Sequence, residues 1–297
     1  MNSDHSMDAP RPQRTIAAPA AVEGIGYWSG RKVRVEFRPA PPCSGIVFVR
    51  KDMEGCPRLP ADIRYCQDTP RRTTLRSGQV TVEMVEHVLA ALSGLEIDNC
   101  EIWVDQPEMP GCDGSCLPFV EALLSGGIKD QNAPRERFYV PRVLRVGDQT
   151  GWLEVRPAAS GKRYIRYELD YGPCSPIGRQ SLETVVSPRH FRTKLAPSRT
   201  FLLEAEAAEI KARGLAKHAT FRDLLVFGPE GPIDNQLRFP DECVRHKIVD
   251  LIGDLALAGF DLMGRIVAYR SGHRLNAELI RTIVAEKEER MLLKNCA

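Results

Sequence analysis

The sequence lacks long apolar runs and an excess of charge of one sign. No stretch approaches the roughly 18 uninterrupted apolar residues of a membrane-spanning helix, and Met1 to Pro12 contains no apolar signal-peptide segment. The 41 Lys and Arg residues nearly balance the 39 Asp and Glu residues, which leaves a net charge of +2. We therefore expect no secretion by that route, no stable membrane insertion and no extended surface for nucleic acid.

Cysteine is present, but in no redox or metal-binding pattern. The nine cysteines are scattered from Cys43 to Cys296, and the closest pair, Cys112 and Cys116, does not have C-x-x-C spacing. An odd number of scattered cysteines indicates reduced thiols in a cytoplasmic protein, most of them acting as small buried apolar side chains. We assign no chemistry to any of them.

The order of strand-like and helix-like segments predicts an α+β protein with two similar units. A chain of 297 residues, 43% of them hydrophobic, is long enough for two compact domains. In the first half, the expected strands and helices cover 32–38, 45–49, 82–94, 100–104 and 117–124. In the second half they cover 151–155, 164–169, 241–257, 265–269 and 275–293. The segment N-A-P-R-E-R, within 132–138, breaks the pattern and marks the expected boundary.

The most informative segment is V-R-H-K-I-V-D-L-I-G-D-L, residues 244–255. On an α-helix, His246, Asp250 and Asp254 follow one another at i, i+4 and i+8, so they share one face, opposite an apolar face. A histidine and a carboxylate one turn apart can reach the same metal ion, as in the H-E-x-x-H motif. The alternative is a hydrogen-bonded pair on a solvated helix face.

A third candidate ligand, His87, stands in the first half of the chain, directly after Glu86. Two histidines and one carboxylate leave a fourth zinc position open, which is the pattern of a hydrolytic site. Such a site needs a neighbouring carboxylate to take a proton from water, and Glu86 is the candidate. A lone helical histidine is more often structural, and that alternative applies to His87 as well.

Another histidine, His273, follows an expected strand and a glycine, where a loop can project it into a cleft. Asp254 could orient it and keep it charged. A histidine held by a carboxylate remains protonated near neutral pH, so it can stabilise an oxyanion or protonate a leaving amine.

At these residues the chain resembles the UDP-3-O-acyl-N-acetylglucosamine deacetylases, the zinc enzymes of the committed step of lipid A biosynthesis. The resemblance covers nearly the whole chain. Its motifs are Q-R-T, V-E-G-I-G, R-P-A-P-P, V-E-H, L-A-A-L-S-G-L-E-I-D-N, D-G-S, S-R-T-F, R-F-P-D-E, V-R-H-K-I-V-D-L-I-G-D-L and S-G-H-x-L-N.

The resemblance implies a role for each candidate residue in hydrolysis of the substrate's N-acetyl group. One zinc ion per chain would be bound by His87, His246 and Asp250. Glu86 would be the general base, and His273 the cationic partner oriented by Asp254. Thr200 would help to hold the oxyanion, Lys247 would bind substrate near the metal, and Phe201 would lie beside the sugar.

The resemblance also implies a fold of two α+β domains of similar topology, each a sheet with helices packed on it, with the active site at their interface. We expect a disordered tail over 1–12, a first domain over 13–134 and a second over 135–293. An insert in the second domain would form an apolar passage for the acyl chain. The expected protein is a cytoplasmic monomer whose partner is an acylated UDP-amino-sugar.

The chain departs from the family pattern at positions that concern the substrate. These positions are Trp28, Glu83, Met84, Gly111, Cys112 and His218 to Thr220. They leave every proposed catalytic residue intact and bear on the acyl-chain length, the nucleotide contacts and the exact sugar. Two other functions remain open: a related zinc amidase acting on another N-acyl amino sugar, and a catalytically silent paralogue that binds an acylated nucleotide or a protein partner.

Overall fold

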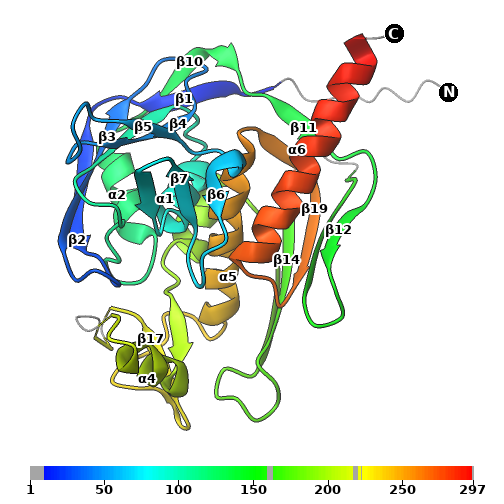
Figure 1. Cartoon of the computed structure of the whole chain (residues 1–297). Helices are drawn as coiled ribbons and strands as arrows, with labels where there is room; N and C mark the ends of the chain where they lie inside the picture. The colour runs from blue at the N-terminus through cyan, green and yellow to red at the C-terminus, as the bar shows by residue number, and fades with distance from the viewer. Residues whose placement is uncertain (1–9, 159–162, 217–219, 222, 296–297) are drawn as a thin grey trace.

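The computed structural model describes residues 10–158, 163–216, 220–221 and 223–295 (Figure 1). The first half is built on a five-stranded sheet of order β2-β3-β9-β4-β5. Its strands are β2 (Ala20–Ile25), β3 (Lys32–Pro39), β4 (Ile46–Arg50), β5 (Arg58–Pro60) and β9 (Cys100–Val104). Its helices are α1 (Glu86–Gly94) and α2 (Leu117–Ser125). Alternation along β3 buries Val33, Val35 and Phe37, as a strand with one face on the core requires.

The second half repeats this arrangement with the order β12-β13-β19-β14-β15, and β11 also pairs with β19. Its strands are β11 (Arg137–Tyr139), β12 (Leu144–Gly147), β13 (Trp152–Arg156), β14 (Arg163–Asp170), β15 (Arg179–Val185) and β19 (Asp261–Tyr269). Its helices are α3 (Pro188–His190), α5 (Glu242–Leu255) and α6 (His273–Asn295). The first sheet has one parallel pair, β4 with β9, and in the second sheet both β14 and β11 pair with β19 in parallel. The predicted α+β class and the similar topology of the two halves are confirmed.

Three smaller sheets complete the described strands. β1 (Pro12–Ile16) pairs with β10 (Ile128–Pro134), and β6 (Cys66–Gln67), β7 (Thr74–Ser77) and β8 (Val80–Glu83) form a meander. In the second half, β16 (Phe201–Leu203), α4 (Glu204–Ala212), β17 (Leu225–Gly228) and β18 (Gly231–Pro232) form a small βαβ insert, at the lower left of Figure 1.

Two local predictions differ from the structure. The first helix starts at Glu86 and not at residue 82, because the backbone of Glu83 pairs with Pro107 and Met109 and Met84 has a left-handed φ of 58°. His273 is the first residue of α6 and not a loop residue, because the N–H of Asn276 bonds to the carbonyl of Gly272 and closes the first helical turn.

The folded part of the chain starts before residue 13, and the two large sheets are divided near residue 134. Pro12 begins β1 and Arg11 is ion-paired with Asp98, so both belong to the folded part of the chain. All strands of the first five-stranded sheet precede residue 134 and all strands of the second sheet follow it, which supports the division into domains that we propose.

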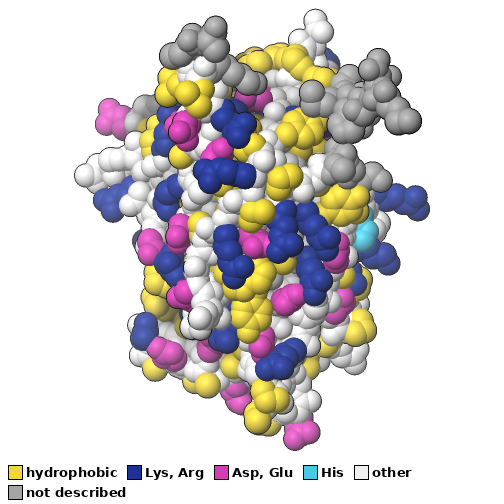
Figure 2. Space-filling model, turned by 90° about the vertical axis from the view of Figure 1, so that its right-hand side faces the viewer, with side chains coloured by type: hydrophobic (Ala, Val, Ile, Leu, Met, Phe, Trp, Pro, Cys, Tyr) yellow, Lys and Arg dark blue, Asp and Glu magenta, His cyan; other side chains and the backbone are white. Residues whose placement is uncertain are grey.

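The helices and the surface charges bear on whether the protein could cross a membrane or present one sign of charge. Of the helices in the described part of the chain, none has both the length and the apolar composition that crossing a bilayer requires. On the face shown in Figure 2, Lys and Arg side chains are interspersed with Asp and Glu side chains.

Candidate metal centre and active site

His87, His246 and Asp250 lie together in the structure. Their ligand atoms are all within 4.8 Å of one another, and all three side chains are buried. Oδ1 of Asp250 is 3.3 Å from Nε2 of His246 and 3.6 Å from Nε2 of His87. Ligands about 2.0–2.1 Å from a tetrahedral zinc ion are roughly 3.3 Å apart, so the cluster has the spacing of a metal site.

The protonation states of His246 and Asp250 are also those that metal binding requires. Burial lowers the pKa of His246 to about 4, which keeps the imidazole neutral. Burial raises the pKa of Asp250, but His246 and Lys247 outweigh burial and hold it well below its usual value. Nδ1 of His246 donates to the carbonyl of Ser198, at 3.2 Å, and thereby leaves Nε2 free as a ligand. A neutral imidazole and an ionised carboxylate are donors that zinc prefers.

A glycine allows the two ligand-bearing helices to approach. His87 lies in the first turn of α1, and His246 and Asp250 lie on α5. A Cβ atom at Gly253 of α5 would be 2.0 Å from the carbonyl oxygen of Glu86, far inside contact distance. The main chain of α1 therefore rests directly on α5, as Figure 1 shows for the two helices at the centre of the molecule.

Thr200 is positioned by a buried ion pair that sequence reasoning missed. Its hydroxyl donates to the carbonyl of Gly114 at 3.1 Å and lies 3.2 Å from Nε2 of His246. The preceding residue, Arg199, is paired with Glu242, which is fully buried and also accepts the backbone N–H of Arg199. The motifs could have indicated this pair, because Arg199 belongs to S-R-T-F and Glu242 belongs to R-F-P-D-E.

Glu86 lies beside the cluster, and its side chain is buried. Its side chain lines the same cavities as His87, and the backbone N–H of Thr73 donates to its Oε2 at 2.9 Å. Burial raises the pKa of Glu86, an effect that His273 and His87 oppose. A carboxylate with a raised pKa is a better proton acceptor for water near neutral pH.

His273 and Asp254 form the expected pair. Nδ1 of His273 is 2.9 Å from Oδ2 of Asp254. Burial lowers the pKa of His273, but the charge and hydrogen bond of Asp254 outweigh burial and raise it to about 9. The imidazole is therefore a cation at neutral pH, on the same cavity as His87 and His246.

The two predicted substrate-binding residues also lie at this site. Nζ of Lys247 donates to Oδ2 of Asp250 at 2.8 Å, and this carboxylate raises the pKa of the lysine against the effect of burial. Phe201 meets the ring of His246 edge to face at 6.1 Å and the ring of Tyr171 at 5.9 Å.

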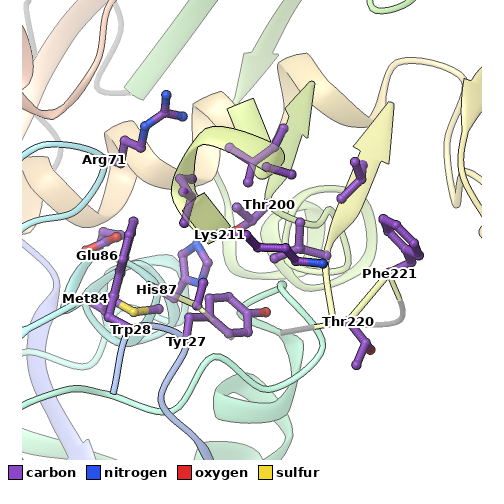
Figure 3. Close-up of a pocket in the computed structure, with 16 residues that line it drawn as sticks. Tyr27, Trp28, Arg71, Met84, Glu86, His87, Thr200, Lys211, Thr220 and Phe221 are labelled. Carbon is purple, nitrogen blue, oxygen red and sulfur yellow. The ribbon is translucent and has the colours of Figure 1, made fainter. Parts of the chain in front are cut away.

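Two cavities meet at the cluster. The polar one, of about 960 Å³, contains His87, His246, Asp250 and His273. The smaller and more apolar one, of about 100 Å³, shares Glu86, His87 and Thr200 with it and continues between Trp28, Met84, Leu202, Ile210, Val226 and their neighbours (Figure 3). In Figure 3, His87 stands between Glu86 and Tyr27, below Thr200. The βαβ insert supplies Leu202, Ile210 and Val226, so it forms one wall of the apolar cavity.

Several departures from the family pattern line this apolar cavity. Trp28, Met84 and Thr220 are among its lining residues. Glu83 pairs with Arg72 at 2.9 Å, and the guanidinium of Arg72 lies 4.8 Å from the Trp28 ring centroid. His218 and Ala219 lie outside the described residues. The remaining two, Gly111 and Cys112, adjoin Tyr27, whose ring a Cβ at Gly111 would meet at 2.2 Å.

Two similar α+β units that enclose a buried His-His-Asp cluster, with a carboxylate and a His-Asp pair on the same cavity, are typical of a metal-dependent hydrolase. The family described as UDP-3-O-acyl N-acetylglycosamine deacetylase matches residues 13–285. The chain therefore belongs to the UDP-3-O-acyl-N-acetylglucosamine deacetylase family, as its motifs predicted.

Relatives with this name come from several bacteria. The chain is 37% identical over 281 residues to the UDP-3-O-acyl-N-acetylglucosamine deacetylase of Myxococcus xanthus, covering 92% of this chain and 87% of that protein. It is 36% identical over 277 residues to that of Solibacter usitatus, with 93% and 92% covered. It is 37% identical over 278 residues to that of Haemophilus influenzae, with 93% and 91% covered.

Proposed function

We propose that this protein hydrolyses the N-acetyl group of UDP-3-O-acyl-N-acetylglucosamine, giving UDP-3-O-acyl-glucosamine and acetate, in the committed step of lipid A biosynthesis. The enzyme acts as a zinc-dependent monomer in the cytoplasm. The observation that carries this proposal is the buried cluster of His87, His246 and Asp250 at the point where a polar and an apolar cavity meet. A substrate with a charged nucleotide and a fatty chain needs both kinds of cavity.

The residues around the cluster have complementary roles in this reaction. His87, His246 and Asp250 would hold the zinc ion, which would supply a Lewis acid for the amide carbonyl and for water near neutral pH. Glu86 takes a proton from the attacking water. The Thr200 hydroxyl and the His273 cation stabilise the negative charge on the carbonyl oxygen, and each such donor contributes on the order of 3 kcal/mol. Glu86 and His273 are the two groups available to protonate the departing amine.

The two cavities support a placement of the substrate's acyl chain and polar part. The acyl chain lies in the apolar cavity against the βαβ insert, where Leu202, Ile210 and Val226 provide apolar surface. Lys247 binds the polar part of the substrate near the metal, and Phe201 lies beside the sugar.

A second candidate is a related zinc amidase for another N-acyl amino sugar. It is favoured by Trp28 and Met84, which replace the family's usual residues and line the apolar cavity beside Glu86 and His87. It differs from the main proposal in the acyl group or sugar accepted, and not in the ligands or in Glu86.

The first experiment measures zinc content and acetate release in wild type, His246→Ala and Glu86→Gln. We expect about one zinc per chain in wild type, none in His246→Ala, and full zinc with a loss of about 10²-fold to 10⁴-fold in kcat for Glu86→Gln. His190→Ala is the matched control, because His190 lies outside the cluster and bonds to Thr184. Wild type that binds zinc but releases no acetate favours the second candidate, and wild type that binds no zinc refutes both.

A further inference from the structure

One residue of the first half, Thr73, is bonded to both parts of the proposed acid-base machinery. Thr73 is 2% exposed and directly precedes β7. Its backbone N–H donates to Oε2 of Glu86 at 2.9 Å, and its carbonyl accepts the N–H of Val85. Its hydroxyl donates to Oδ1 of Asp254 at 2.5 Å. The backbone of Thr73 therefore contacts the start of α1, whereas its side chain crosses to the second half of the chain.

The Thr73 hydroxyl completes the shell of donors around Asp254. Oδ2 of this carboxylate accepts from Nδ1 of His273 at 2.9 Å and from Nδ2 of Asn276 at 2.8 Å. Oδ1 accepts from Thr73, whose oxygen is also 3.1 Å from Nδ1 of His273. With donors on both oxygens, Asp254 cannot rotate without breaking a hydrogen bond in a site that is 2% exposed.

The orientation of His273 depends on this carboxylate. Nδ1 of the imidazole is held by Asp254, so Nε2 is the ring nitrogen left for the cavity that His273 shares with His87 and His246. A carboxylate free to turn would let the imidazole turn with it. Misplacing a reacting group by about 1 Å can cost 10²-fold in rate, so a fixed orientation of the ring contributes to the rate.

We propose that Thr73 is a positioning residue for deacetylation: its hydroxyl fixes the Asp254-His273 pair while its backbone N–H fixes Glu86. This inference rests on the deacetylase function proposed above. It makes Thr73 the link between the base from the first half and the imidazolium from the second half.

The test compares Thr73→Val, which keeps the branched shape and removes the hydroxyl, with Thr73→Ser, which keeps the hydroxyl. We expect Thr73→Val to lower kcat roughly 10-fold to 100-fold with KM within about twofold and zinc content unchanged. Thr73→Ser should retain most of the wild-type kcat. If packing of the side chain is what matters, the order is reversed, with serine the more damaging change, and the proposal fails.

The next residue provides a matched control. Thr74 is 5% exposed, and its hydroxyl oxygen has no hydrogen-bond partner within the described part of the chain. Thr74→Val is therefore the same chemical change at a neighbouring buried site, and it should leave kcat and KM unchanged. An equal loss in Thr74→Val and Thr73→Val would show a general effect of the substitution and overturn the proposal.

A double mutant separates positioning from a structural role. If Thr73 acts through His273, then Thr73→Val should cause no further loss of kcat in a His273→Ala background. Multiplied losses, or loss of zinc or of the fold in Thr73→Val alone, would assign Thr73 to structure and overturn the proposal. Wild type that releases no acetate overturns this proposal and the proposed function together, whereas active wild type with an unimpaired Thr73→Val overturns this one alone.

Discussion

Replacing Gly253 by alanine tests whether the metal centre depends on the close contact of α1 with α5. The added methyl would be 2.0 Å from the carbonyl oxygen and 2.8 Å from the carbonyl carbon of Glu86. Both atoms are main chain, so no side-chain rotation can relieve the contact. The two helices must separate, and His87 must then move away from Asp250, from which it is now 3.6 Å.

The expected loss of stability is the difference of two opposing effects. Overpacking a close-packed core costs about 1–3 kcal/mol, and a clash with backbone belongs at the upper end. Alanine inside a helix is about 1 kcal/mol more favourable than glycine. The net change for Gly253→Ala is therefore a loss of about 2 kcal/mol in the free energy of unfolding. For a chain of this size, that lowers Tm by about 3 °C.

The assay is thermal unfolding of zinc-free protein, followed by a zinc titration. We expect a lower Tm and weaker zinc binding in Gly253→Ala. Gly272→Ala is the stability control, because a Cβ at Gly272 meets no other atom within 4 Å. A Gly253→Ala protein with raised Tm and unchanged zinc affinity would show that α1 does not rest on α5, and the account of the metal centre would be wrong.

Two further predictions concern charged groups around the site. In zinc-free protein, the pKa of His273 is expected at about 9, against an ordinary value of 6.5, so the contribution of the charged imidazole to stability is fully present below pH 6.5 and is lost as pH rises through 9. An NMR titration measures this pKa, and binding of zinc should lower it. A value near 6.5 in the zinc-free protein would refute the pairing with Asp254. Glu242→Gln leaves Arg199 without its buried partner, so the free energy of unfolding should fall by about 3–5 kcal/mol. Glu23→Gln, at an exposed ion pair with Arg34, should cost less than about 1 kcal/mol in the same urea denaturation, and equal losses would contradict this reading.

The sequence predicted best what lies within one helix. His246, Asp250 and Asp254 share a face because helical periodicity fixes their relation, and the structure confirms a helix there. The proximity of His87 could be proposed only from ligand chemistry and the family resemblance, since no local rule relates residues 87 and 246. Thr73 had no detectable signal, because a lone threonine before a short strand gives no periodic pattern and its partners are 181 and 200 positions away.

The fold explains why the site depends on the contact between the two halves. The halves have the same strand order, but the first supplies His87, Glu86 and Thr73, whereas the second supplies the other metal ligands and the Asp254-His273 pair. Neither half alone contains a complete donor set. The same interface holds four buried or half-buried charges: Arg11 and Arg135 each pair with both Asp98 and Asp261, at 2.7–3.1 Å. Since these ion pairs join residues from both halves, they oppose separation of the halves, which would take His87 away from His246 and Asp250. The contact between the halves is therefore required for the geometry of the active site.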